Sequence, residues 1–280
     1  MADSFDDVLA ALDLTEVGRG QYRARHLGGP GQVVFGGQIL AQTIVSAART
    51  LPAKDIRSVH TVFARGASLD ADLDIEVEPM HEGRVVGSAT VTVRQGDRLC
   101  SRSLVLASTG EPDLIRHAPP MPVVEGPTNV LAGHAPWWEI AFVGDVDIND
   151  PALVGPPELL VWTRVTGSSE DAAANQALLA YATDGFLIAT AMRPHEGIGQ
   201  AQAHRSLSTS VLTHTLTFHE PVVAADWHLL AHESPYAGRG RAYGRAHVFA
   251  QDGRLVASYV QESLLRANPS WDPSQEASRY

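Results

Sequence analysis

Cysteine and lysine are almost absent from this sequence. Cys100 is the single cysteine, which excludes an internal disulfide and a zinc site built from cysteines. Lys54 is the single lysine, so a Schiff-base or P-loop lysine is excluded at every other position. Long apolar runs are missing too. Clean runs such as 186–189 are far shorter than the roughly 20 residues that span a bilayer, so no membrane helix is expected.

Basic charge is scarce as well. Lys and Arg total 21 against 32 Asp and Glu, which gives a formal net charge of −11 with His neutral. A chain this acidic has no global positive field, so nucleic-acid binding is not expected. The stretch Met1–Asp7 is acidic where a signal peptide is basic. Together these features predict a soluble cytoplasmic protein, in reducing surroundings and with no membrane partner.

The chain does have enough apolar material for two packed domains. Its 280 residues, 44% of them hydrophobic, suit two domains of about 140 residues. Nine of the 17 prolines fall between Pro112 and Pro157, a density that stops helices and interior strands. We therefore predict an N-terminal domain over 1–110, a proline-rich linker over 111–156 and a C-terminal domain over 157–280.

Both halves show the same order of elements. In each, an Ala-rich run with helical spacing of apolar residues precedes four runs typical of strands. The helices are predicted over 37–50 and 171–183, with an additional strand at 158–166. The strands that follow the helices are predicted at 56–65, 73–80, 85–94 and 98–107 in the first half, and at 209–218, 227–233, 242–250 and 254–265 in the second.

The last hairpin of each half indicates a duplicated domain. Gln95–Leu99 and Gln251–Leu255 both place Gly and Asp between strand-like runs, at an offset of 251 minus 95, or 156. A helix that is apolar on most faces must be buried, and a curved antiparallel sheet wraps a thin Ala-rich helix closely. The predicted fold class is α+β, with two antiparallel sheets that each wrap a long Ala-rich helix.

Several common catalytic motifs do not occur. The sequence has no Gly-x-Ser-x-Gly elbow, no Gly-x-Gly-x-x-Gly loop and no His-Glu-x-x-His pair. The 12 histidines are scattered, and the spacing of His214 and His219 puts them on opposite faces of one strand. We therefore expect no metal and no cofactor.

Two polar residues interrupt apolar surroundings in the second half. Asp184 stands at the end of the predicted helix, where the helix dipole disfavours negative charge and burial is costly. It is either an Asp that turns out to solvent or a general base in an apolar cleft. Gln261 interrupts the last strand, and either faces solvent or faces inward and needs a hydrogen-bond partner.

A local basic cluster stands out in this acidic chain. Arg239, Arg241 and Arg245 alternate with glycines. Such a cluster can hold a phosphate group. The alternative is a solvated strand face.

Five segments carry a resemblance to a known family. They are Phe35–Gln42, Ser58–Arg65, Tyr181–Asp184 with Met192–His195, Phe218–Pro221, and Val256–Glu262. In this order and at this spacing they resemble the acyl-CoA thioesterase II family, over residues 10–267.

The resemblance implies a double hotdog fold and hydrolysis of acyl-CoA thioesters to a free fatty acid and coenzyme A. The family's catalytic set is an Asp on the second-half helix, a Thr or Ser on the next strand and a Gln on the last strand. The Asp corresponds to Asp184 and the Gln to Gln261. Acyl-CoA is thus the implied substrate, and a homodimer or homotetramer is expected by analogy. The residues predicted to bind the substrate are Gly36, Gly37, His60, Arg239 and Arg241.

The third catalytic position departs from the family. Counting back from Phe218 and His219, the family hydroxyl falls at Val211, which cannot bind a water. We predict that Thr213 supplies the hydroxyl, because strand alternation puts it on the same face as Val211. A one-residue shift of the alignment favours Ser210 instead. In the first half, Arg-Pro-Gly-Asp of the family becomes Arg-Gly-Ala-Ser, and a paired Arg-Arg becomes Ala-Thr.

Two other functions fit parts of the sequence. A hotdog hydratase or dehydratase acting on enoyl thioesters pairs a His with an acidic residue, and His214 and His60 are the strand histidines available for this. A non-catalytic acyl-CoA-binding protein is suggested by Val211. Product analysis separates the three functions, because only hydrolysis releases a free thiol.

Overall fold

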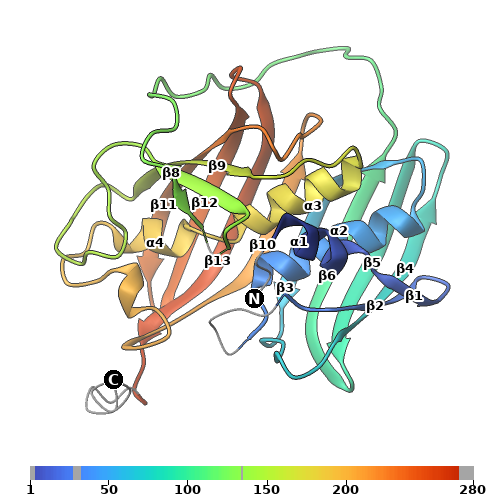
Figure 1. Cartoon of the computed structure of the whole chain (residues 1–280), viewed down its shortest axis with the longest axis horizontal. Coiled ribbons are helices and arrows are strands. Elements are labelled where there is room, and N and C mark those ends of the chain that lie inside the picture. The colour runs from blue at the N-terminus through green and yellow to red at the C-terminus, as the bar shows by residue number, and fades with distance from the viewer. Residues whose placement is uncertain (1–3, 28–32, 134, 271–280) are drawn as a thin grey trace.

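The computed structural model describes residues 4–27, 33–133 and 135–270. Within these ranges, 13 antiparallel strands form one continuous sheet that extends through both halves of the molecule (Figure 1). Its strand order is β1-β2-β4-β5-β6-β3-β10-β13-β12-β11-β9-β8-β7. The first-half strands are β1 (Thr15–Gly18), β2 (Gln21–Ala24), β3 (Asp55–Phe63), β4 (Leu73–Glu82), β5 (Val86–Gln95) and β6 (Arg98–Ser108). The second-half strands are β7 (Leu131–Ala132), β8 (Trp138–Phe142), β9 (Glu158–Val165), β10 (Leu207–Phe218), β11 (His228–Gly238), β12 (Arg241–Ala250) and β13 (Leu255–Ala267).

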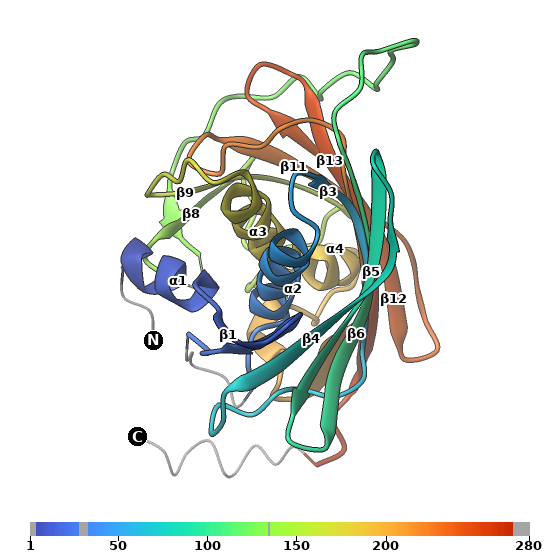
Figure 2. The same ribbon diagram turned by 90° about the vertical axis from the view of Figure 1, so that its right-hand side faces the viewer.

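The helices lie on the concave side of this sheet, with the first of them at its open side (Figure 2). They are α1 (Phe5–Leu12), α2 (Gly36–Thr50), α3 (Ala172–Thr183) and α4 (Leu187–Met192), with one turn of 3-10 helix at Gln200–Gln202. Figure 2 shows α2 and α3 at the centre, with the sheet curved around them. The predicted α+β class, in which antiparallel strands wrap an Ala-rich helix in each half, is confirmed.

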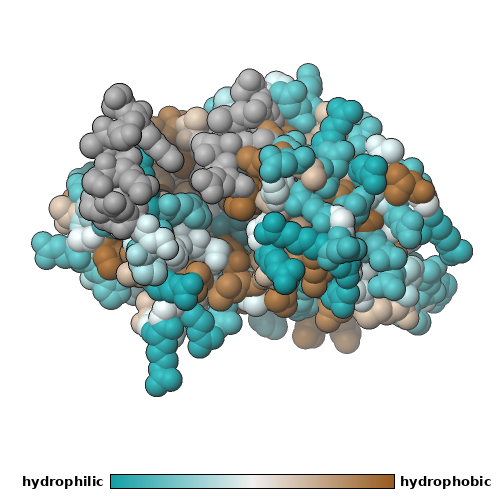
Figure 3. Space-filling view, turned by 90° about the horizontal axis from the view of Figure 1, so that it is seen from below, coloured by the Kyte–Doolittle hydropathy of each residue, from teal (hydrophilic) through white to brown (hydrophobic). Residues whose placement is uncertain are grey.

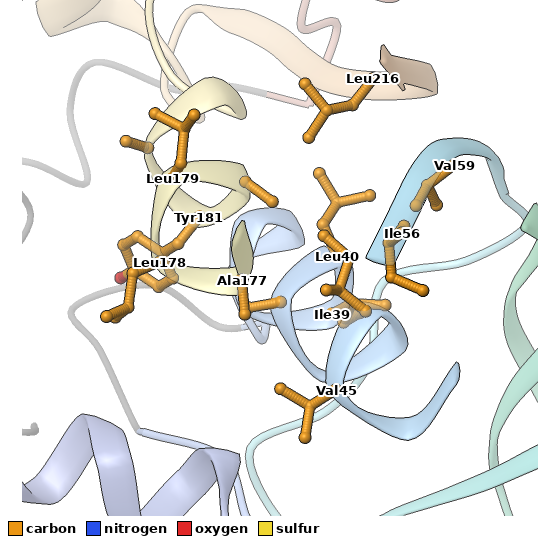
Figure 4. Close-up of a cluster of buried hydrophobic side chains, with 14 of the residues drawn as sticks. Ile39, Leu40, Val45, Ile56, Val59, Ala177, Leu178, Leu179, Tyr181 and Leu216 are labelled. Atoms are coloured by element: carbon orange, nitrogen blue, oxygen red, sulfur yellow. The ribbon is translucent and has the colours of Figure 1, made fainter. Parts of the chain in front are cut away.

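Small residues allow the two central helices to approach closely. Ala47 of α2 and Ala177 and Ala180 of α3 are fully buried. A Cβ added to Gly37 would lie 2.4 Å from the carbonyl oxygen of Tyr181, so the backbones are in direct contact. Figure 4 shows apolar side chains from both helices meeting those of β3 and β10. The core is therefore shared between the halves, and burial of this apolar surface stabilises their association.

The two predicted sheets are joined edge to edge. β3 of the first half pairs with β10 of the second, from Thr213 opposite Val62 to Thr217 opposite Ser58. The ladder satisfies backbone groups that two separate sheets would leave exposed at their edges. It also fixes the position of one half relative to the other.

The two hairpins predicted from Gly and Asp are present. β5 and β6 join through Gly96 at φ +57°, and β12 and β13 join through a turn with Gly253 at φ +90°. Both φ angles lie in the left-handed region, which glycine adopts without a steric penalty.

Part of the predicted proline-rich linker belongs to the sheet. The stretch 109–130 contains no strand, whereas β7 and β8 pair with each other and β8 pairs with β9. No proline occurs between Pro136 and Pro151, and the aromatic residues of that stretch favour a strand. Trp137 and Trp138 are both buried there.

One face of the molecule is mostly polar. The face in Figure 3 is mainly hydrophilic, with hydrophobic side chains scattered over it. In the part of the chain that the structure describes, no helix has the length and apolar character needed to cross a membrane.

Candidate active site

Asp184 lies in a tight turn between two helices. It is the C-cap of α3, and two residues later Phe186, at φ +73°, begins the turn into α4. The Asp184 Oδ2 atom accepts a hydrogen bond of 2.9 Å from the backbone N–H of Gly37, at the start of α2. A Cβ on Gly36 would lie only 2.7 Å from the same oxygen. Glycine at the start of α2 thus lets a first-half helix approach a second-half carboxylate.

Burial sets the protonation of this carboxylate. Asp184 as a residue is half-buried, yet its Oδ1 atom is enclosed and has no hydrogen-bond partner among the described residues. Burial raises the pKa of Asp184 to about 7, while the Gly37 N–H lowers it. The carboxylate therefore does not turn out to solvent, and it titrates near neutral pH.

Gln261 faces the same region from β13. Its side chain is 1% exposed, and its Nε2 atom donates to the backbone oxygen of Thr183 at 3.2 Å. The Gln261 Oε1 atom is buried without a hydrogen-bond partner among the described residues. Because Thr183 immediately precedes Asp184, this bond holds the amide beside the turn that carries the carboxylate. Gln261 thus faces inward and leaves a free acceptor.

A neutral histidine lies beside Gln261 on the inner face of the sheet. His214 on β10 lies directly opposite Gln261 on β13. The Thr183 hydroxyl donates to the carbonyl oxygen of Ala180 at 2.8 Å, so it accepts from His214 Nε2 at 2.9 Å. Burial lowers the pKa of His214 to about 4, so the ring is neutral at physiological pH. This contact orients the last turn of α3.

Tyr259 and His232 form a second buried pair that the sequence did not indicate. The His232 Nδ1 atom donates to the carbonyl oxygen of Leu159 at 2.9 Å, so its Nε2 accepts from the Tyr259 hydroxyl at 2.5 Å. Tyr259 also stacks on His214, with ring centroids 5.4 Å apart. Burial lowers the pKa of His232 to about 4, and burial together with the Asp184 charge raises that of Tyr259. The only available signal was the position of Tyr259, two residues before Gln261.

Aromatic side chains enclose the other side of the turn. Tyr181 contacts Phe35, Trp137 and Trp138, with ring centroids 4.9, 5.0 and 5.6 Å apart respectively. Phe186 packs against Trp138 and His232. This wall removes water from around Asp184, which is the physical origin of its raised pKa.

The prediction that Thr213 shares a strand face with Val211 is wrong. Leu212 is an extra residue in β10, because Val211 pairs with Ser263 while Thr213 already pairs with Glu262. Thr213 therefore faces away from Gln261, and its hydroxyl accepts from the Glu262 N–H at 3.3 Å. This placement gives Thr213 no direct path to a water beside Asp184. Ser210, the alternative, is exposed.

The other predicted binding residues lie apart from Asp184. His60 is exposed on the outer face of β3, with its Nδ1 atom 3.3 Å from Thr215 Oγ1. Arg241 is exposed and forms an ion pair of 3.0 Å with Glu262, on the outer face of β12. Arg239 lies in the turn between β11 and β12, at φ +54°. Of the predicted binding residues, the structure thus brings the two glycines to Asp184 and places these three elsewhere.

A surface groove of about 620 Å³ lies between the β1–β2 hairpin, β4 and the end of α2. It does not include the residues around Asp184. Its charged residues are mostly acidic, which is unfavourable for the phosphate groups of coenzyme A. The charged side chains that line it are Glu16, Arg19, Arg49, Glu76, Glu78 and Glu82. Within the described ranges, no group of three or more His, Cys, Asp or Glu is placed to hold a metal ion.

The fold defines a class of protein. An antiparallel sheet around a buried helix in each half is the double hotdog fold, which this chain shares with solved thioesterase structures. The acyl-CoA thioesterase N-terminal domain matches residues 25–108, and the acyl-CoA thioesterase C-terminal domain matches residues 117–265. The chain therefore belongs to the acyl-CoA thioesterase family.

Known relatives match over nearly the full chain. Acyl-CoA thioesterase 2 of Haemophilus influenzae is 26% identical, with 95% of this chain and 99% of the relative covered. Human acyl-coenzyme A thioesterase 8 is also 26% identical, over 96% of this chain and 91% of the relative. Among solved structures, a TesB protein of Mycobacterium avium subspecies paratuberculosis is 27% identical at a TM-score of 0.80, covering 94% of this chain and 100% of that one.

Proposed function

We propose that this acyl-CoA thioesterase uses Asp184 as a general base and Gln261 as a positioning group for the attacking water. The observation that carries the proposal is the pair of buried acceptor atoms without partners, Asp184 Oδ1 and Gln261 Oε1. Buried polar atoms are normally satisfied, and a water bound between these two would satisfy both. Thr183 connects the two side chains, since it precedes Asp184 and accepts from Gln261.

Hydrolysis then proceeds without a covalent intermediate. The water donates one hydrogen to Asp184 Oδ1 and the other to Gln261 Oε1, and its oxygen attacks the thioester carbonyl carbon. The first proton passes to Asp184 as the new C–O bond forms. Collapse of the tetrahedral intermediate breaks the C–S bond, and the leaving thiolate takes the proton from Asp184. The products are a fatty acid and coenzyme A.

The start of α2 is the proposed site for the oxyanion. The N–H groups of the first turn of a helix have no intrahelical acceptor and lie at the positive end of the helix dipole. Gly37 already donates to Asp184, which leaves Gly36 as the proposed donor to the substrate oxygen. Glycine at this position also keeps the path to the backbone open.

The arginine cluster is still proposed to bind substrate, provided that one of its ion pairs opens. Arg239 and Arg241 remain proposed contacts for the phosphates of coenzyme A, at the turn between β11 and β12. Arg241 must exchange its carboxylate partner Glu262 for a phosphate to do so. His60 is on the outer face of the sheet and has no part in the proposed mechanism.

The geometry favours hydrolysis over hydration of an enoyl thioester. Hydration requires a His paired with an acidic side chain, but the His214 Nε2 atom is bonded to the Thr183 hydroxyl. His60 lies on the outer face. A hydratase would change the enoyl absorbance without releasing thiol, and a binding protein would bind acyl-CoA without turnover.

The test is thiol release from acyl-CoAs of graded chain length by Asp184→Asn. The amide keeps the acceptor for Gly37 but cannot take a proton, so kcat should fall by about two to four powers of ten. Asp97→Asn, in an exposed hairpin turn, is the matched control and should retain full activity. Full activity of Asp184→Asn would contradict the assignment of the base, and tight binding without turnover by the unaltered protein would favour the binding protein.

Assembly and location remain predictions. Exposed apolar residues on the outer face of the sheet, Val62, Leu104 and Leu106, would be covered in a homodimer or homotetramer. Sedimentation velocity measures the assembly, and Val62→Glu should shift it toward the monomer. The cytoplasmic location is likewise a proposal, which a fluorescent fusion would test.

A further inference from the structure

Ser263 is a buried serine that lies opposite Val211, the position to which the family resemblance assigns a catalytic hydroxyl. Val211 on β10 pairs directly with Ser263 on β13. Side chains of directly opposed residues in an antiparallel pair share one face, with Cβ atoms about 4.5–5.5 Å apart. A hydroxyl absent from β10 at this point can therefore be supplied by the directly opposed residue of β13, on the same face of the sheet.

Ser263 lies on the inner face, with the site residues. Along β13, Tyr259, Gln261 and Ser263 are each at most 2% exposed, at the period of two that one strand face requires. Ser263 is thus one inward position beyond Gln261. Its neighbour on the other side, Ala242 of β12, is buried and apolar.

The strands on either side of Ser263 leave its hydroxyl without a cross-strand side-chain hydrogen bond. Its two cross-strand neighbours, Val211 and Ala242, offer no polar side-chain atom. A buried hydroxyl of this kind normally bonds to the protein or to an ordered water. Asp184 Oδ1 and Gln261 Oε1 are unpartnered on the same side of the sheet. These two enclosed acceptors can share one bound water, and because a bound water makes about three hydrogen bonds, it can also accept one from the Ser263 hydroxyl.

We propose that Ser263 supplies the third water-positioning group and replaces, across the strand pair, the hydroxyl that Val211 lacks. This inference rests on the proposed function of Asp184 and Gln261. The Ser263 hydroxyl donates to one lone pair of the water oxygen, while the water donates its hydrogens to Asp184 and Gln261. The remaining lone pair is aimed at the thioester carbonyl. Ser263 is therefore a positioning residue, and it takes no proton.

The test is steady-state hydrolysis by Ser263→Ala and by Ser263→Cys, which keeps the side-chain shape but replaces the hydroxyl with a larger, weakly donating thiol. Both should lose kcat by about tenfold or more with KM nearly unchanged, because the hydroxyl acts on the water and not on bound substrate. The double variant Val211→Thr with Ser263→Ala returns a hydroxyl to the opposite strand and should recover most of kcat. A structural role for Ser263 would not give this recovery.

Two further variants make the outcomes separable. Ser258→Ala is the matched control, since Ser258 is on the same strand but faces outward between His219 and His247. Asp184→Asn reports on the base. If Asp184→Asn is inactive while Ser263→Ala and Ser263→Cys keep full kcat, only the proposed role of Ser263 is overturned. The same role is overturned if the double variant is as slow as Ser263→Ala. If Asp184→Asn is fully active, the proposed mechanism itself fails.

Discussion

At the scale of single residues, Asp184 is held between opposing electrostatic effects. The aromatic wall and the buried Oδ1 atom disfavour the charged form, while the Gly37 N–H stabilises it. The balance gives a pKa of about 7. A general base is most effective when its pKa lies near the working pH, because it is then both ionised and able to accept a proton.

This pKa predicts the acid limb of the pH profile. Hydrolysis requires ionised Asp184, so kcat/KM should fall about tenfold for each pH unit below about 7 and level off above it. His214 and His232, with pKa values lowered to about 4, stay neutral over this range and do not account for the limb. Initial rates of thiol release between pH 5 and 9 give the profile. A limb centred near pH 4 would contradict burial as the controlling factor.

The same shift has a consequence for stability, with a definite sign. The folded state binds the Asp184 proton more tightly than the unfolded chain, whose Asp pKa is about 3.9. The contribution of the Asp184 side chain to the free energy of unfolding is therefore fully present below about pH 4 and is lost as the pH rises through 7. Asp184→Asn should raise the melting temperature relative to the unaltered protein at pH 8, and not at pH 4. This readout also shows that the variant is folded.

At the scale of elements, the start of α2 and the α3–α4 turn form one unit. Gly36 is required there because a Cβ would lie 2.7 Å from Asp184 Oδ2, below van der Waals contact. Gly36→Ala should displace the carboxylate and lower kcat by about tenfold or more, since small misplacements of catalytic groups are costly. The melting temperature should change little, because Ala is the better helix former.

A glycine in open space provides the comparison. Gly126→Ala, where an added Cβ meets nothing within 4 Å, should leave both kcat and the melting temperature unchanged. Equal activity of Gly36→Ala and Gly126→Ala would mean that Asp184 moves aside freely, and that its bond to Gly37 does not matter for hydrolysis.

The sequence indicated most of the regular elements. The predicted helices at 37–50 and 171–183 correspond to α2 and α3, because their Ala-rich apolar surface requires burial. The strand following each helix and its three successors were predicted from alternation and Gly-Asp turns. The extra residue Leu212 in β10 was not, because a bulge leaves no local mark in an otherwise regular pattern. α4 was missed because it follows Phe186, whose positive φ is held only by tertiary packing.

Some residues of the candidate site could likewise be predicted from the sequence, and others could not. Asp184 and Gln261 were singled out because a carboxylate and an amide within apolar runs are costly to bury, and the family resemblance then favoured an inward, catalytic position over a solvent-facing one. Ser263 drew no attention in the sequence, since a serine in a strand is ordinary. Its interest arises only from its partner Val211, which lies 52 residues earlier (263 minus 211) and is brought opposite by the register of the two strands.

At the scale of the whole molecule, the halves depend on each other. Asp184 belongs to the second half, and the N–H that bonds it belongs to Gly37 in the first, 147 residues away in sequence. The β3–β10 ladder and the contact of α2 with α3 hold this geometry. The connecting stretch 109–130 contains no strand, and Leu114 and Ile115 are almost fully exposed. The covalent connection therefore contributes little to the site.

Cutting that connection tests this dependence. A protease recognition sequence placed between Leu114 and Ile115, then cleaved, should leave two fragments that stay associated through the β3–β10 ladder and the shared core. Thiol release by the cleaved protein should remain within about twofold of the uncut protein, because no contact at Asp184 involves the cut segment. Size-exclusion chromatography under native conditions checks the association, and uncut protein carrying the same insertion is the control.

The fragments 1–114 and 115–280 produced separately should each release no thiol, since one lacks Asp184 and the other lacks the start of α2. Activity of 115–280 alone would show that the first half is dispensable, and with it the bond from Gly37 to Asp184.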